Sequence, residues 1–385
     1  MHGSASRDDT SRKGSTWPSE SSQYRDPATG ALVRQVTGHP SINHPPYFLQ
    51  SAFTPDGAAL VFTSYRAGAA QLFEAAWPEG TIRQLTAGPA IHPFSAAIHP
   101  RGEWVFFVRG GEIWRLDRRT LEERVVAAFP GAQLGECSLA PGGEWVAAAI
   151  KDGARCGIVC GRADGRGWGF IPFPRTVIHP QFHPLEPEWI EFAADPAPRM
   201  HRVRRDGAGV ECLLEHGNHE FVVHETFLGQ TGDIVFTIWP RALLRMDWTT
   251  RAVRAIAEFN CWHIAPNRAG TAVLCDTNHP DRGIFLIDVS TGSRRQVCLS
   301  ASSSQGSQWR TSRYALAEDF ARARAGAADG ALSWMESAAD TVYGPQWTHP
   351  HPAFSHDERR ITFASDRTGH AQVYAADLPG SGFSD

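Results

Sequence analysis

The chain repeats one short pattern of apolar and polar positions at a nearly constant interval. Each repeat has an apolar anchor residue, a polar turn and then an apolar strand, as in "FTPDGAALVFTSY" from Phe53 and "IHPRGEWVFFV" from Ile98. Further anchors stand at Leu139, Phe182, Phe227, Ile264 and Phe354. The first six anchors lie 45, 41, 43, 45 and 37 residues apart. This spacing is typical of four-stranded propeller blades.

The two ends of the chain complement one another. The last repeat stops after "QVYAADLPG" without a fourth strand, whereas "DPATGALVRQVTG" at 26–38 resembles the end of a third strand followed by a fourth. We therefore predict that the N-terminal strand completes the last blade and closes the ring, which removes the exposed sheet edges. The pattern predicts an all-β fold, a seven-bladed β-propeller closed by the N-terminal strand.

Two segments do not follow the repeat. Residues 1–23 are polar and are predicted to be a disordered N-terminal tail, which leaves 24–385 as a single propeller domain. The last two anchors are 90 residues apart, and the excess at 300–343 is rich in alanine with few β-branched residues. That composition permits helix, so we expect a partly helical insertion before the last blade. An eighth, degenerate blade is the alternative.

Composition narrows the class of protein. Charged residues make up 20% and the formal net charge is −4. The chain therefore lacks the basic excess that would indicate nucleic acid or an anionic membrane surface as a partner. No apolar stretch is long enough to cross a bilayer, and residues 1–23 lack the apolar core of a signal peptide. The seven cysteines are scattered and odd in number, which favours a reducing, cytoplasmic setting.

Polar side chains gather at one position of the repeat. The innermost strand of each blade should precede the anchor and line the central channel, and side chains three and one before the anchor share a face. None of the residues three before an anchor is a large aliphatic one: Gln50, Ser95, Glu136, His179, His224, Cys261 and His351. His263 and His349 fall on the same face. Five histidines from four blades should therefore converge on the axis.

Several imidazoles with an amide close by can bind a metal ion. Nitrogen donors with an amide oxygen suit a first-row dication such as Mn²⁺, Fe²⁺ or Zn²⁺. A single channel histidine is more often a hydrogen-bonded wall residue, and His99 and His183 stand at ordinary turns. Cys261 is read more simply as a small buried apolar residue. From the residues alone, a metal site and a purely structural role both stay open.

The chain resembles the oligogalacturonate lyases, polysaccharide lyase family 22. The resemblance rests on "YRDPATGALV", "PRMHRVRRDG" at 198–207, "HETF" at 224–227, "CWHI" at 261–264 and, most specifically, "QWTHPHPAF" at 346–354. It implies a seven-bladed propeller with Mn²⁺ held by His263, Gln346, His349 and His351. It also implies that His224 is the proton-abstracting base and that Arg199 is a second catalytic residue, which holds a substrate carboxylate or stabilises the charge that develops. The resemblance also implies that His44 and Tyr47 contact the substrate. From its position in the channel, we expect His179 to contact the substrate as well.

The implied reaction is β-elimination on a short, acidic, uronate-containing oligosaccharide. The sequence departs from the family pattern at Pro45, where a basic residue is usual, and in the short segment "FAADPAPRM". These departures concern substrate binding, so a different acidic sugar is an alternative. Two others remain: a non-catalytic, TolB-like binding or scaffold propeller, and another metal-assisted reaction, such as hydrolysis or epimerisation, with Glu136 as the acid. The sequence does not indicate an oligomeric state.

Overall fold

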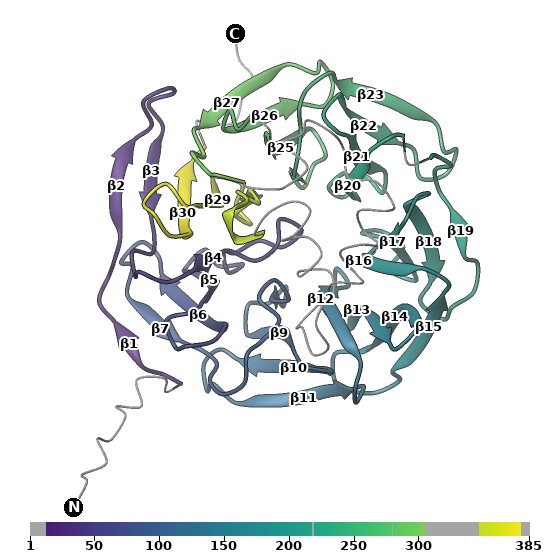
Figure 1. The fold of residues 1–385 in the computed structure, drawn as a ribbon, viewed down its shortest axis with the longest axis horizontal. Coiled ribbons are helices and arrows are strands. Elements are labelled where there is room, and N and C mark those ends of the chain that lie inside the picture. Colours follow the sequence, from purple (N-terminus) through teal and green to yellow (C-terminus); the bar gives the residue numbers. More distant parts are fainter. Residues whose placement is uncertain (1–12, 218, 279, 305–345, 379–385) are drawn as a thin grey trace, which may run out of the picture.

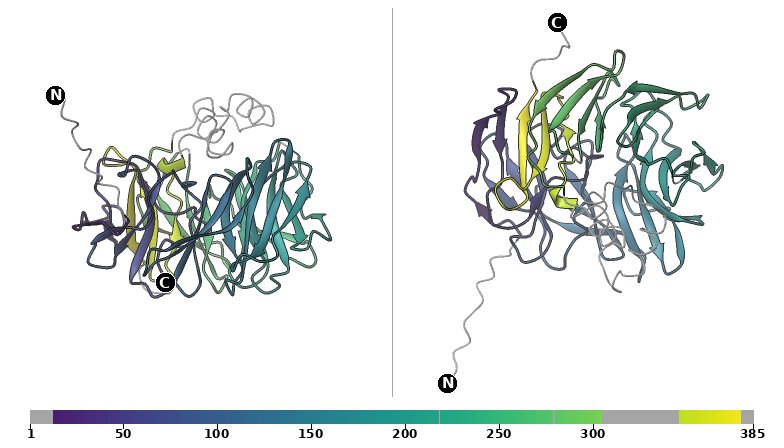
Figure 2. Two further views of the ribbon diagram at one scale, coloured as in Figure 1. Left: turned by 90° about the horizontal axis from the view of Figure 1, so that it is seen from below. Right: turned by 45° about the horizontal axis from the view of Figure 1, so that its top comes forward.

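Seven antiparallel sheets form a closed ring in the computed structural model (Figure 1), which describes residues 13–217, 219–278, 280–304 and 346–378. Figure 2 shows the same ring from the side, as a disc. The prediction of a seven-bladed β-propeller is confirmed.

The strands of the first four blades follow one another along the chain. The first blade contains β4 (Asn43–His44), β5 (Ala59–Ser64), β6 (Gln71–Ala76) and β7 (Ile82–Gln84), with β1 (Thr16–Trp17) outside them. The second contains β8 (Ala97–Ile98), β9 (Trp104–Arg109), β10 (Glu112–Asp117) and β11 (Glu123–Ala128). The third contains β12 (Gln133–Leu139), β13 (Trp145–Asp152), β14 (Arg155–Arg162) and β15 (Gly169–Phe173). The fourth contains β16 (Thr176–Phe182), β17 (Trp189–Asp195), β18 (Met200–Arg204) and β19 (Glu211–Cys212).

The remaining blades close the ring. The fifth contains β20 (Val222–Phe227), β21 (Ile234–Ile238), β22 (Ala242–Met246) and β23 (Val253–Ala257). The sixth contains β24 (Ile264–Pro266), β25 (Ala272–Asp276), β26 (Ile284–Asp288) and β27 (Arg294–Cys298). The seventh contains β28 (Ala353–Phe354), β29 (Arg360–Ser365) and β30 (Gln372–Asp377), then β3 (Leu32–Gln35) and β2 (Ser22–Arg25). A 3₁₀ turn, η1 (Gln346–Thr348), precedes β28.

The cores lie between neighbouring blades. One apolar cluster joins Ala147 and Ile158 of the third blade to Ile190 and Phe192 of the fourth, and all four are buried. Strands covered on both faces need apolar residues at successive positions, which explains runs such as "LVFTS" and "WIEFAA". The blades therefore hold one another in place and fix where their innermost strands end.

The N-terminal strand closes the ring as predicted. β3 pairs with β30, and Val33 lies opposite Ala376. The predicted tail at 1–23 is wrong for its last part: β1 pairs with β7, and the Trp17 ring lies 5.6 Å from that of Phe73. The apolar Trp17 and the register with β7 hold this segment on the first blade. Residues 1–12 lie outside the described part of the chain.

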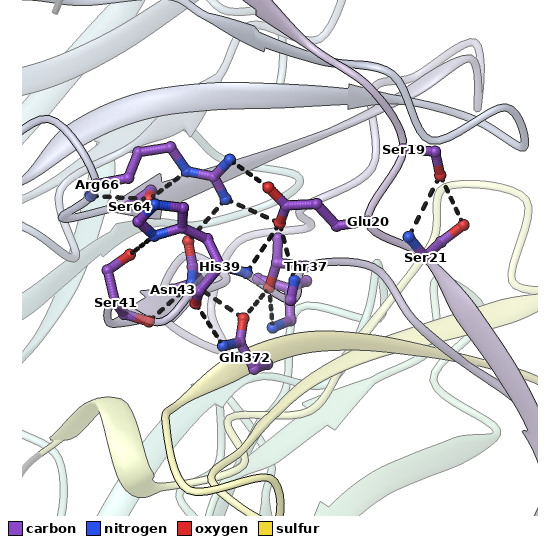
Figure 3. A network of polar contacts seen from close by, with 12 residues as sticks. Ser19, Glu20, Ser21, Thr37, His39, Ser41, Asn43, Ser64, Arg66 and Gln372 are labelled. Atoms are coloured by element: carbon purple, nitrogen blue, oxygen red, sulfur yellow. Dashed lines mark hydrogen bonds and ion pairs between the residues drawn. The ribbon is translucent and has the colours of Figure 1, made fainter. Parts of the chain in front are cut away.

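A polar network fastens this segment across the junction of the first and seventh blades (Figure 3). Glu20 accepts hydrogen bonds from Arg66 at 2.7 and 3.1 Å, and Arg66 also donates to Asn43 at 3.2 Å. Asn43 donates to Gln372 of β30 at 2.9 Å. The network thus ties the N-terminal segment and blade seven to the residue that precedes His44.

Glu20→Gln is expected to lower the free energy of unfolding by about 1.5–3 kcal/mol at neutral pH, because Arg66 would lose its charged partner. Burial raises the pKa of Glu20, but bonds from Arg66 and from the N–H groups of Gly38 and His39 lower it more, so its pKa is below 4.5. A carboxyl group whose pKa is lowered by folding stabilises the folded protein at pH values above its pKa in the unfolded chain. This stabilisation is lost as the pH falls through its pKa in the folded protein.

The difference between wild type and Glu20→Gln should therefore be largest above pH 4.5 and vanish in stronger acid. Denaturant unfolding at several pH values measures it. Glu79→Gln, an exposed glutamate of the first blade, is the matched control. A pH-independent loss in Glu20→Gln would contradict the ion-pair explanation.

The predicted insertion at 300–343 lies mostly outside the described residues, since 305–345 are not described. Its beginning is fastened to the seventh blade: the Ser303 N–H donates to Asp366 at 2.8 Å, and the Ser302 hydroxyl donates to the Thr348 carbonyl. Among the described residues, no helix is both long enough and apolar enough to cross a membrane.

Candidate metal centre and catalytic site

The innermost strands of the third, fourth and fifth blades are not regular. Their pairing with the next strand shifts at the polar position before the anchor: between Leu134 and Cys137, Ile178 and Gln181, and Val223 and Thr226. His179 and His224 occupy these irregularities with φ of 52° and 57°, and His351 has φ of 46°. Left-handed backbone at residues other than glycine is strained and concentrates at functional sites. Simple alternation alone therefore does not decide where these histidines point.

Three histidines meet at the hub. Ring nitrogens of His263, His349 and His351 all lie within 4.8 Å of one another, and all three residues are buried. The ring centroids of His263 and His351 are 4.1 Å apart. His263 directly precedes β24, and the other two lie between η1 and β28, so two neighbouring blades supply the group. One ion can touch all three at this spacing.

A buried carboxylate orients one of them. Asp276 of β25 lies 2.8 Å from His263 Nδ1 and accepts the His263 backbone N–H at 2.6 Å. Burial raises the pKa of Asp276 to about 8, against the effect of that N–H bond. An Nδ1–H donated to a carboxylate leaves Nε2 with its lone pair, which is the usual arrangement of a metal-binding histidine.

The donor set fits a divalent ion. Both ring nitrogens of His351 are buried without a hydrogen-bond partner among the described residues, which is unfavourable unless something binds them. Burial lowers the pKa of His263 and His351 well below 6.5, so both are neutral and able to bind a metal ion. The η1 turn places Gln346 beside them, and its carbonyl accepts the His349 N–H at 3.0 Å. The Gln346 side chain remains a predicted ligand.

Asp276→Asn is expected to weaken metal binding about 10–100-fold while leaving the fold intact, because an amide cannot ionise to balance the bound cation and holds the His263 Nδ1–H less strongly. Titration of chelator-stripped protein with Mn²⁺ measures the dissociation constant. Asp281→Asn is a control, since Asp281 bonds Ser300 and the Ser302 N–H instead. Unchanged Mn²⁺ affinity in Asp276→Asn would argue against an ion at His263.

His224 stands beside this group without belonging to it. Its ring centroid is 4.6 Å from that of His263, and its Nδ1 is buried without a hydrogen-bond partner among the described residues. The edges and faces of Trp262 and Phe48 enclose it, with centroids at 4.5 and 5.5 Å. Burial first, then nearby histidines and Arg199, lower the pKa of His224 well below 6.5. It is therefore a neutral imidazole that can accept a proton.

Arg199 lies between β17 and β18 and is held by carboxylates. It forms ion pairs with Asp195 and, at 3.4 Å, with Glu225, and its backbone N–H donates to His216 at 2.9 Å. Alternation predicts that Glu225 points away from the face of His224. Glu225 is buried and lies within reach of Arg199, next to the irregular pairing of β20.

The three predicted substrate contacts lie in different surroundings. Tyr47 stacks on His179 with centroids 4.6 Å apart and lies 4.9 Å from the His351 ring. His44 is buried, stacks on Phe94 at 4.3 Å and lies 2.9 Å from the Pro45 carbonyl. Burial lowers the pKa of His44 to about 4, so it is neutral. His44 thus packs in the wall, whereas Tyr47 reaches the hub.

Sequence reasoning missed four residues of this region. Phe48 packs against His224 and His263, and Asp276, Glu225 and Asp195 orient His263 and Arg199. Phe48 follows Tyr47 directly, and Glu225 follows His224, so nearness in sequence was the available signal. Nothing in the repeat pattern distinguishes Asp276 from other strand-end aspartates.

Comparison with known proteins agrees with the resemblance stated above. A family model described as oligogalacturonate lyase matches residues 12–164. The chain is 22% identical to the oligogalacturonide lyase of Pectobacterium atrosepticum, over 96% of this chain and 99% of that one. It is 23% identical to the oligogalacturonate lyase of Dickeya dadantii, over 93% and 96%. A solved structure of oligogalacturonate lyase in complex with manganese superposes with a TM-score of 0.79 at 21% identity, over 96% and 99%.

Proposed function

We propose that this chain is a metal-dependent lyase that cleaves short galacturonate oligosaccharides by β-elimination. One observation carries the proposal: three buried imidazoles within 4.8 Å of one another adjoin a fourth, separate imidazole at the hub of the ring. A scaffold propeller has no need of such a group. The relatives named above supply the substrate class, an oligomer of galacturonate.

The metal-binding residues in this proposal are His263, His349 and His351, with Gln346 as a fourth donor. The likeness to a manganese complex favours Mn²⁺, which accepts nitrogen and oxygen donors. When bound, the ion neutralises the uronate carboxylate and so makes the proton on the neighbouring carbon, C5, easier to remove. Asp276 keeps His263 in the tautomer that exposes its lone pair.

His224 removes the C5 proton. Its lowered pKa keeps the ring unprotonated near neutral pH, and its buried Nδ1 has no competing partner among the described residues. The rings of Phe48 and Trp262 enclose the imidazole and keep it desolvated, which favours its neutral form before substrate binds. The positive φ of His224 fixes the direction of the ring relative to His263.

Arg199 binds the acidic substrate. A guanidinium holds a carboxylate through two parallel hydrogen bonds, and Asp195 and Glu225 set its orientation. Asp195 and Glu225 balance the charge of Arg199, so the preference for an anionic sugar over a neutral one comes from the directed N–H groups of Arg199 together with the bound cation.

Incubation of the protein with di- and trigalacturonate in the presence of Mn²⁺ tests the proposal. β-Elimination creates a conjugated double bond in one product, so ultraviolet absorbance should rise, and a chelator should abolish the rise. New reducing ends without absorbance would indicate hydrolysis. Absence of any product across a panel of uronate oligomers would refute the lyase assignment.

A further inference from the structure

The roles proposed above leave one atom of the reaction without a partner. As the bond from C4 to the glycosidic oxygen breaks, that oxygen gains negative charge and needs a proton. His224 acts as the base at C5, and a separate proton donor beside the leaving oxygen would stabilise that charge as it develops. A second imidazole with a carboxylate partner lies next to the hub, in the blades that do not contribute to the metal centre.

That pair consists of Glu136 of β12 and His179 of β16. His179 Nδ1 lies 3.5 Å from Glu136 Oε2, and the two side chains are 10% and 11% exposed. Desolvation raises the pKa of Glu136, but its interaction with His179 lowers the pKa further, to about 2. Glu136 is thus a nearly buried carboxylate beside Nδ1 of His179, where it can orient the imidazole ring.

His179 is also placed at the site. Tyr47 stacks on it with an angle of 17° between the rings, and the other ring neighbours of Tyr47 include His351 and His263, with centroids at 4.9 and 6.2 Å. The Tyr47 ring therefore connects His179 to the metal-binding histidines. Because Nδ1 faces Glu136, Nε2 is the nitrogen available to a ligand.

The two non-ligand imidazoles at the hub have opposite surroundings. His224 is enclosed by Phe48, Trp262 and His263, none of which carries negative charge. His179 has Glu136 beside it. A carboxylate beside one imidazole and an apolar enclosure around the other are differences in surroundings that can divide acid and base roles between two similar groups. Both residues also share the left-handed backbone conformation that directs their rings.

We propose that His179, oriented by Glu136, is the general acid that protonates the leaving glycosidic oxygen; this inference rests on the proposed lyase function. His224 takes the C5 proton, and the C5–H electron pair becomes the second bond between C4 and C5. The pair of the breaking C4–O bond goes to the oxygen, which takes the proton from His179 Nε2. His224 ends protonated and His179 neutral, and exchange with water restores both.

The test compares two leaving groups in wild type and in His179→Asn. Asparagine tolerates the positive φ of residue 179 and cannot donate as an acid. One substrate is digalacturonate, whose sugar leaving group needs a proton. The other is a galacturonate with nitrophenolate at C4, which leaves as a stable anion.

His179→Asn should reduce kcat at least about 100-fold on digalacturonate and less than about 5-fold on the nitrophenolate substrate. His224→Asn should reduce kcat on both, because C5–H removal is still required. Equal losses of His179→Asn on both substrates would overturn the proposal. Inactive wild type on both would instead refute the proposed function, so the two failures are distinguishable.

Two further variants guard against a merely structural explanation. Glu136→Gln should show the same dependence on leaving group with a smaller loss, because it leaves the ring of His179 in place. His179→Gly also accepts the positive φ, and added imidazole should restore part of its kcat on digalacturonate. Mn²⁺ content and melting temperature should match wild type in each. His370→Ala, an exposed histidine of the last blade, is the matched control. Failure of imidazole to restore activity in a folded His179→Gly would also count against the proposal.

Discussion

His349→Ala is expected to lose both the bound ion and activity. His349 is fully buried and provides one of three nitrogens that lie within 4.8 Å of one another. Two remaining imidazoles bind a dication much more weakly, and without the ion the uronate carboxylate keeps its charge as C5 loses its proton. Since neutralising that charge provides several kcal/mol, kcat should fall by about a thousand-fold or more.

Elemental analysis of protein purified without chelator measures the ion, and product absorbance measures turnover. Wild type should hold about one ion per chain, and His349→Ala should hold almost none. His370→Ala, with an exposed histidine, should keep both ion and activity. One retained ion per chain in His349→Ala would contradict the assignment of this residue as a ligand.

The architecture could be predicted because it depends on a repeat. Apolar anchors at Phe182, Phe227 and Phe354 end β16, β20 and β28, as the spacing indicated. The closing strand was predictable because a blade that lacks its fourth strand needs a partner. The N-terminal boundary was wrong because Trp17 and Glu20 are held by contacts with Phe73 and Arg66, distant in sequence, which local composition does not reveal.

The grouping at the hub was partly predictable. His263, His349 and His351 were placed on one face by their distance from the anchors, and they do lie together. Regular alternation nevertheless did not reveal the contact of Glu225 with Arg199, because the pairing of β20 is irregular at this point. Asp276 was also missed, since its role comes from pairing between β24 and β25 that positions it beside His263. Such cross-strand relations need the register, and one sequence does not contain it.

His224→Asn is expected to reduce kcat by about 100- to 10,000-fold while the Mn²⁺ content stays at that of wild type. His224 is not one of the three histidines whose nitrogens lie within 4.8 Å, so its loss leaves the ligands in place. Asparagine accepts the φ of 57° at this position, which keeps the backbone of β20 and its neighbour Glu225 undisturbed.

In His224→Asn, kcat should fall while the binding of substrate and metal stays close to that of wild type. The KM for digalacturonate should change little, because Arg199 and the ion bind the carboxylate in both enzymes. Replacement of the C5 hydrogen by deuterium should slow wild type if C5–H cleavage limits the rate. A His224→Asn enzyme with full kcat would show that another group removes the proton. Loss of the ion in the same variant would instead make His224 part of the metal centre and leave the base to be found elsewhere at the hub.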